Sequence, residues 1–271
     1  MKITRITTQK NNNNRYNIYI DAGAGEAYGF SVDEAVLVEY RLRKGLVIDD
    51  AMVSEFIAKD TFHQSYALAI RYLGYRMRSK KEVYDYLHKK EVEDEHISAV
   101  IDRLVANHLL DDEQFAKAFV QTRINTSSKG PLLIEQELLH KGISRDLCAR
   151  ALQMYDDSLQ YERALKWTQK KSNTRKKESY RKRKQRLQAS LTRKGFTQHV
   201  IKEVIEATLP AKDDETEREA LVFQGEKLRR KYERKFSDQA LTNKLKEGLY
   251  RRGFSIEEID QYIDDSIEKD L

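Results

Sequence analysis

Two kinds of hydrophobic periodicity run along the 271-residue chain. Near the N-terminus, Tyr16, Ile18 and Ile20 alternate with polar neighbours, which is the period-two pattern of a strand with one apolar face. The segments 3–7 and 26–30 are predicted to pair with this strand as a hairpin or meander, because turn-forming residues separate the three. In most of the remaining chain, apolar residues recur at spacings of three and four, which predicts amphipathic helices.

Capping signals mark where several of these helices begin. Ser79 and Glu82 have the spacing of a capping box, in which each side chain satisfies an unpaired N–H group at the helix start. Ser31 and Glu34 have the same spacing and predict a helix that continues to Lys44-Gly45.

A basic residue followed by glycine marks where helices are predicted to end. Glycine adopts the left-handed conformation of a helix C-cap without strain, and the cation faces the negative end of the helix dipole. Counted by the second residue of each pair, the steps are 45, 52, 53 and 58 residues. Such periods are typical of helical repeat arrays. The pairs are Lys44-Gly45, Lys89-Lys90 as a degenerate copy, Lys141-Gly142, Lys194-Gly195 and Arg252-Gly253.

The predicted fold class is all-α: an elongated array of tandem three-helix repeats with a small N-terminal β-hairpin or meander element. Residues 1–60 are predicted to hold the β element and a partial repeat, with a helix at about 49–59. Four repeats follow, at 61–108, 109–155, 156–209 and 214–269. A charged fraction of 35% with only two prolines agrees with long solvated helices.

The net charge of +6 is concentrated in one part of the chain. The window 166–186 contains eleven Lys or Arg residues and a single acid, Glu178. Acids that would normally intersperse for ion pairing are nearly absent, so this basic segment is predicted to bind a polyanion, with Tyr180 available to stack on a base. The alternative is an ordinary solvated helix face.

Little in the sequence indicates catalysis. Asp111-Asp112 fits helix capping better than metal binding, and the six histidines are not at ligand spacing. Phosphate-binding loops are absent, and Gly23-x-Gly25 is predicted to precede a strand rather than a helix. Cys148, the single cysteine, is expected to be a small buried residue. We therefore predict a protein that is not an enzyme and has no cofactor and no metal.

The cell compartment is predicted from two further features. No apolar run approaches 18 residues, so we expect no membrane span. A single cysteine suits a reducing environment. The prediction is a soluble, cytoplasmic protein, and a monomer.

Five motifs occur in one order between residues 71 and 143. They are Arg71-Tyr72-Leu73, Arg76-x-Arg78-Ser79-x-x-Glu82, Leu110-Asp111-Asp112-x-x-Phe115-Ala116, Lys129-Gly130-Pro131 and Glu137-Leu138-x-x-Lys141-Gly142-Ile143. Together they resemble the bacterial RecX family of regulators of the RecA recombinase. The strong resemblance covers roughly residues 65–152, and a weaker one continues to about 209.

The resemblance implies a non-enzymatic regulator that binds RecA filaments and inhibits their ATPase activity, extension and strand exchange in recombination and DNA repair. The alternative is a sequence-nonspecific DNA-binding protein that acts through the 166–186 segment, on single- or double-stranded DNA. For Arg71, Arg76 and Arg78, surface ion pairing and partner contact both remain open. The candidate RecA- or DNA-binding residues are Arg71, Arg76, Arg78, Lys129, Arg175, Lys176, Lys177, Arg181, Lys182, Arg183, Lys184 and Arg186.

Overall fold

The computed structural model describes residues 1–10, 12–172, 177–209 and 211–267. Its elements form two compact units. One unit comprises 1–116 and 140–147, and the other comprises 117–139 and 148–271.

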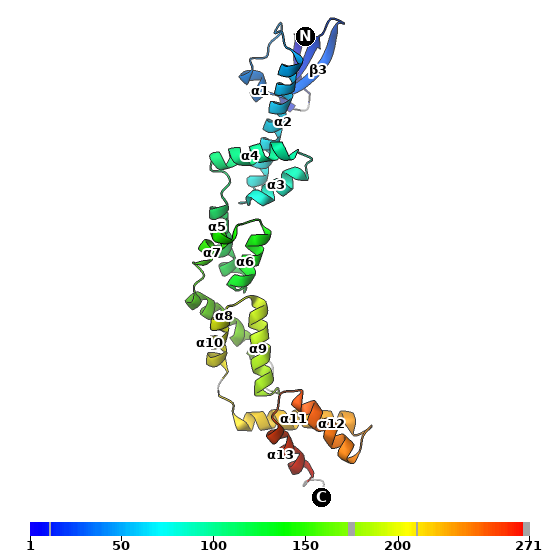
Figure 1. The fold of residues 1–271 in the computed structure, drawn as a ribbon, viewed down its shortest axis with the longest axis vertical. Coiled ribbons are helices and arrows are strands. Elements are labelled where there is room, and N and C mark those ends of the chain that lie inside the picture. Colours follow the sequence, from blue (N-terminus) through cyan, green and yellow to red (C-terminus); the bar gives the residue numbers. More distant parts are fainter. Residues whose placement is uncertain (11, 173–176, 210, 268–271) are drawn as a thin grey trace. The chain divides into compact units, whose positions relative to one another are not determined.

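The N-terminal element is a three-stranded antiparallel sheet in the order β1 (Lys2–Gln9), β2 (Asn12–Asp21) and β3 (Glu26–Asp33). This confirms the predicted small β element. Helices α1 (Glu34–Glu39) and α2 (Asp50–Leu73) pack on the sheet (Figure 1). The buried residues of this core are Ile3, Ile18, Phe30, Val32, Val36, Leu42, Ile48 and Phe56.

The capping box predicted for Ser31 and Glu34 is wrong. Ser31 lies within β3, and the N-cap of α1 is Asp33, whose carboxylate accepts the N–H of Ala35. The predicted end at Lys44-Gly45 is also wrong, since α1 stops at Glu39. Gly45 instead donates its N–H to the carbonyl of Ile3 at 2.8 Å, so this glycine extends the sheet edge rather than closing a helix.

Helix α2 is longer than the pattern indicated. It runs unbroken for 24 residues and passes through the boundary predicted between residues 60 and 61. No glycine or proline occurs between Asp50 and Leu73, so nothing in the local sequence ends the helix there. The proposed division into domains remains a prediction.

A buried ion pair ties α2 to the sheet. Arg15 of β2 makes two hydrogen bonds to the carboxylate of Asp60, at 2.9 and 3.2 Å. The backbone N–H of Asp33 and the side-chain amide of Gln64 also donate to Asp60, each at 2.7 Å. The Asp60 side chain is only 7% exposed, so its charge depends on these four hydrogen bonds.

Three-helix repeats follow, as predicted. Their helices are α3 (Lys80–His88), α4 (Asp94–Ala106), α5 (Asp112–Thr126), α6 (Pro131–His140), α7 (Arg145–Leu152), α8 (Asp157–Ser172), α9 (Tyr180–Lys194), α10 (Gln198–Thr208), α11 (Asp214–Tyr232), α12 (Asp238–Tyr250) and α13 (Ile256–Ile267). The capping box of Ser79 and Glu82 is confirmed at the start of α3. Pro131 is the first residue of α6, where its missing N–H has no intrahelical partner to lose.

The middle helices of successive repeats meet end to end. The hydroxyl of Ser79, at the start of α3, donates to the carbonyl of Lys141, which follows α6, at 2.7 Å. The hydroxyl of Ser179, at the start of α9, donates to the carbonyl of Arg252, which follows α12, at 2.5 Å. Carbonyls at a helix C-terminus lack intrahelical partners, so each contact satisfies one and places opposite dipole ends together.

The contact between the second and third repeats uses backbone alone. The N–H of Gly130 donates to the carbonyl of Lys194 at 2.6 Å, and that of Leu132 to the carbonyl of Gly195 at 3.0 Å. A Cβ on Gly130 would lie 2.4 Å from the backbone of Gly195. The glycine at this position therefore permits a close approach between two repeats.

The basic-plus-glycine pattern has two functions at these contacts. Gly142 and Gly195 have φ angles of +82° and +80°, the left-handed conformation predicted for helix ends. A Cβ on either would also lie 2.6 Å from the preceding repeat, at Lys81 and Leu133 respectively. The degenerate copy is shifted by one residue, because Glu91 rather than Lys90 has the positive φ, +62°.

We predict that Gly130→Ala loosens the contact between the second and third repeats. The added methyl group meets backbone that cannot rotate away, so the third repeat should lose about 2 kcal/mol. Trp167, the single tryptophan, lies on α8 and reports on this repeat during urea unfolding. Gly74→Ala is the matched control, since its Cβ would lie 3.4 Å from the carbonyl oxygen of Arg71, an ordinary van der Waals contact. Equal midpoints for the two variants would contradict the prediction.

Candidate functional site

Four of the exposed cations of the basic segment lie at or just before the start of α9, and two others, Lys166 and Lys170, are exposed on α8. Arg181, Lys182 and Lys184 are exposed, and so is Lys177 just before the helix. The ammonium group of Lys177 lies 3.9 Å from the ring centroid of Phe223 on α11. We call Lys177, Arg181, Lys182 and Lys184 the α9 basic surface.

The remaining candidate residues of the basic segment are paired, half-buried or outside the described residues. Arg186 pairs with Glu178, the single acid of the window, at 3.0 Å. Arg183 is half-buried, and its Nε has no hydrogen-bond partner among the described residues. Arg175 and Lys176 fall in 173–176, outside the described part of the chain.

Arg76 belongs to an ion-pair network at the contact between the first and second repeats. It donates two hydrogen bonds to Glu82, at 2.8 and 3.3 Å, and Lys141 donates a third at 2.7 Å. Burial would raise the pKa of Glu82, but the hydrogen bonds from Arg76, Lys141 and the backbone N–H of Ser79 lower it to about 2. Arg76 is therefore half exposed and also stabilises the contact between the first and second repeats.

We predict that this network makes the first repeat sensitive to acid. The carboxylate contributes stability above its unfolded pKa of 4.5, and this contribution is lost as pH falls towards 2. Glu82→Gln should cost about 2 kcal/mol at pH 7 and almost nothing at pH 2. The measurement is urea unfolding of both proteins by circular dichroism across this range. Glu93→Gln, which alters a side chain 83% exposed, is the control, and a pH-independent Glu82→Gln difference would contradict the prediction.

The remaining three candidates differ in their surroundings. Arg71 is exposed in the last turn of α2. The guanidinium of Arg78 lies 4.1 Å from the ring centroid of Tyr72, which stacks on Tyr86. Lys129 pairs with Glu137, which also pairs with Arg123 at 2.7 Å. Burial would raise the pKa of Glu137, but these two cations lower it.

Two carboxylates make contacts with a neighbouring repeat that the sequence pattern did not reveal, and one of them, Glu217, was not singled out at all. Asp112 accepts the N–H of Lys80 at 2.9 Å, and Glu217 accepts that of Tyr180 at 2.7 Å. Each thereby caps the middle helix of the preceding repeat, and burial raises the pKa of both. This bears out capping as the role of Asp111-Asp112, because Asp111 also accepts from the N–H of Glu113.

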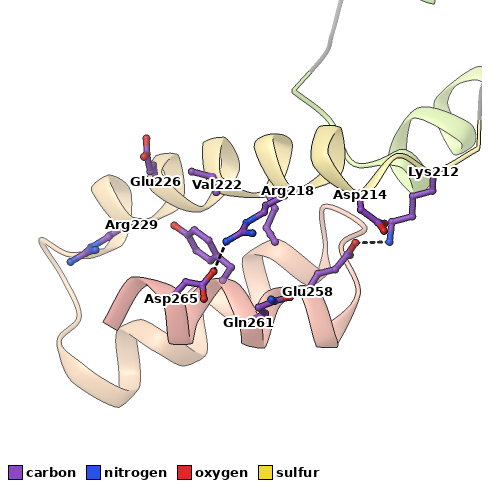
Figure 2. A pocket seen from close by; sticks show the side chains of 11 residues that line it. Lys212, Asp214, Arg218, Val222, Glu226, Arg229, Glu258, Gln261 and Asp265 are labelled. Carbon is purple, nitrogen blue, oxygen red and sulfur yellow. Dashed lines mark hydrogen bonds and ion pairs between the residues drawn. The ribbon is translucent and has the colours of Figure 1, made fainter. Parts of the chain in front are cut away.

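A cleft of about 610 Å³ opens between α11 and α13 (Figure 2). Two ion pairs cross it, Arg218 with Asp265 at 2.8 Å and Lys212 with Glu258 at 2.5 Å. In Figure 2, Glu226 points away from α13. Because most charges lining the cleft are already paired across it, they stabilise the packing of the repeat rather than presenting free groups for chemistry.

Metal binding, membrane spanning and thiol reactivity are three further properties, and none is supported by the described residues. Within them, no group of three or more His, Cys, Asp or Glu side chains is arranged to hold a metal ion. None of the described helices is long and apolar enough to cross a bilayer. Cys148 is buried, and burial raises the pKa of its thiol, which disfavours the reactive thiolate.

These features define a class of protein: a helical protein of tandem three-helix repeats with an N-terminal sheet, in which cations are displayed on a scaffold of stacked helices. Sequence comparison identifies the family. Residues 1–49 match the model of the regulatory protein RecX N-terminal domain. Residues 66–104 and 111–152 match the first and second RecX three-helix domains, and the third matches both 158–205 and 215–263. The chain belongs to the RecX family.

Individual relatives agree. The chain is 49% identical over 268 residues to "Regulatory protein RecX" of Oceanobacillus iheyensis, covering 98% of both chains. It is 41% identical to the protein of that name from Bacillus cytotoxicus, covering 96% of both. A crystal structure of regulatory protein RecX matches with a TM-score of 0.66 and 33% identity, covering 75% of this chain and 98% of the other. RecX from Lactobacillus salivarius matches with a TM-score of 0.53 and 34% identity, covering 55% and 97%. The family models thus match from residue 1 to residue 263, beyond the limits that the motifs indicated.

Proposed function

We propose that the chain is a non-enzymatic, cytoplasmic and monomeric regulator that binds RecA filaments. In binding, it inhibits RecA's ATP hydrolysis, filament extension and strand exchange during recombination and DNA repair. The observation that carries this proposal is the 49% identity over 98% of the chain to a protein named regulatory protein RecX.

The structure supports binding rather than chemistry. The contacts between repeats use helix-end carbonyls together with a few side chains, and the cationic groups of the α9 basic surface take no part in the hydrogen bonds described for these contacts. The α9 basic surface presents four cations, and Arg71 presents another on a different repeat. Several weak contacts on one partner add through effective concentration, so binding should depend on more than one repeat.

DNA binding through 166–186 is the second candidate function. It is favoured by one observation, the exposure of Arg181, Lys182 and Lys184 within the first five residues of α9. Cations exposed in this way suit phosphate contacts, which carry little sequence information. Under this alternative, any effect on RecA would arise from competition for DNA.

Co-sedimentation separates the two functions. RecA filaments are assembled on single-stranded DNA with a non-hydrolysable ATP analogue, and the protein is added once no free DNA remains. We expect it to pellet with the filaments at stoichiometric concentration and to stay in solution without them. A protein that pellets with bare DNA but not with RecA-saturated DNA would support the alternative.

A further inference from the structure

We propose that the outer face of the N-terminal sheet is a stacking platform for the bases of single-stranded nucleic acid. Its central feature is a row across the three strands, formed by Arg5 of β1, Tyr19 of β2 and Tyr28 of β3. This site goes beyond the proposed RecA regulation and is distinct from the α9 basic surface.

Two β-bulges create this row. In β1, Ile3 pairs with Ile20 while Arg5 pairs with Tyr19, so Thr4 is an extra residue. Without it, Arg5 would face the core as Ile3 does, because side chains two apart in a regular strand share a face. The bulge turns Arg5 outward instead.

The opposite edge strand contains the matching irregularity. Ile18 pairs with Phe30 and Tyr19 pairs with Tyr28, which leaves Gly29 as the extra residue of β3. Phe30 is buried in the core, whereas Tyr28 is 58% exposed. Both edge strands thus depart from regular pairing beside Tyr19, and both departures bring a planar side chain to the solvent face.

The geometry of the row suits a planar ligand. The Arg5 guanidinium lies 4.0 Å from the ring centroid of Tyr19, and the rings of Tyr19 and Tyr28 meet edge to face at 6.1 Å and 82°. One face of Tyr19 is therefore covered by Arg5, while Tyr28 is more than half exposed to solvent. Exposed aromatic and guanidinium planes on a sheet are what stack on unpaired bases.

Charge indicates how such a ligand would be held. Glu26 pairs with Arg5 at 2.8 Å, and Asp21 accepts the N–H groups of Gly23 and Gly25. Because Glu26 neutralises the charge of Arg5, attraction for phosphates contributes little at this site. Binding should come from the bases and should depend only weakly on salt, in contrast to the α9 basic surface.

The test measures anisotropy of a labelled 15-mer of deoxythymidine and of an abasic 15-mer with the same phosphates, without RecA. The full chain carries Arg181→Glu, Lys182→Glu and Lys184→Glu, so that phosphate binding at α9 does not mask the sheet. Tyr28→Ala should weaken thymidine binding about 10-fold, leave abasic binding within twofold and leave the salt slope unchanged. The matched control is Tyr75→Ala, whose ring is 85% exposed on another part of the chain.

A second measurement uses the wild-type protein and does not depend on the folding of a variant. Irradiation at 254 nm with the thymidine 15-mer should give a nucleotide adduct on Tyr19 or Tyr28, located by mass spectrometry of the tryptic peptide 16–41. The absence of this adduct, unchanged thymidine binding by Tyr28→Ala, or an equal loss of abasic binding would each overturn the proposal. Because RecA is absent from both experiments, these outcomes leave the proposed regulation untouched.

Discussion

Replacing Asp60 with alanine should unfold the sheet–helix core at much lower denaturant than the wild type, at a cost of about 3–5 kcal/mol. The substitution leaves the Arg15 guanidinium with its side chain only 15% exposed and without its carboxylate. It also removes the acceptor of the Asp33 N–H and of the Gln64 amide. Hydrogen exchange of peptides from β2, β3 and α2 measures this loss of stability locally. A local measurement is needed because a chain of several units does not unfold in a single transition.

Lys59→Ala is the matched control on the same helix. Lys59 pairs with Glu39 at 2.9 Å, but both side chains are 39% or more exposed, so its loss should cost about 0.5 kcal/mol. Trp167 fluorescence should report the same unfolding midpoint in both variants, because α8 belongs to the other unit. Equal exchange rates in Asp60→Ala and Lys59→Ala would show that the buried Arg15–Asp60 pair stabilises the core no more than the exposed Lys59–Glu39 pair does.

Reversing three charges of the α9 basic surface should reduce DNA affinity on the order of 100-fold at 0.15 M salt. The variant is Arg181→Glu, Lys182→Glu and Lys184→Glu, because these side chains are exposed, whereas Arg183 is half-buried. If the wild type neutralises about six phosphates, its log–log salt slope on single strands is near −4. Loss of three contacts should bring the slope to about −2, measured by anisotropy titration at several salt concentrations.

The control applies the same change in net charge elsewhere. The control variant is Lys89→Glu, Arg103→Glu and Lys202→Glu, which alters three exposed cations at the C-cap of α3, on α4 and on α10. This control should lower affinity less than fivefold, because scattered charges do not act on the same phosphates. An equal loss in both triple variants would mean that total charge, rather than the α9 basic surface, controls DNA binding.

Features that depend on neighbouring residues were predicted well from the sequence. The alternation of Tyr16, Ile18 and Ile20 identified the central strand, and Ser79 with Glu82 located the start of α3. Gly142, Gly195 and Gly253 have the expected left-handed conformation because their constraint arises within one helix end. The repeated pattern in turn predicted the three-helix repeats.

Features that depend on distant residues were not predictable. Arg15 and Asp60 are 45 residues apart, and nothing nearby distinguishes Asp60 from an exposed helical acid. Ser31 and Glu34 have the spacing of a capping box, but strand pairing continues through Val32 and Asp33, so the cap moves to Asp33. The bulges at Thr4 and Gly29 are likewise set by pairing across strands rather than by local sequence.

The candidate binding residues show the same limit. All twelve were selected as cations, and charge alone does not distinguish Arg76, which pairs with Glu82 across the start of α3, from Arg181, which is exposed. Exposure in the folded chain separates them. The exposed candidates, which are favoured as contacts for a partner, include Arg71, Lys177, Arg181, Lys182 and Lys184. Their role in binding remains a prediction.

ATP hydrolysis by preformed RecA filaments tests the regulatory proposal most directly. Filaments are assembled on saturating single-stranded DNA before the protein is added, so competition for free DNA does not contribute. We predict that the full chain slows hydrolysis at stoichiometric concentration and shortens the filaments seen by electron microscopy. A variant lacking 156–209 should inhibit far less. An unchanged rate and an unchanged filament length with the wild-type protein would contradict regulation of RecA.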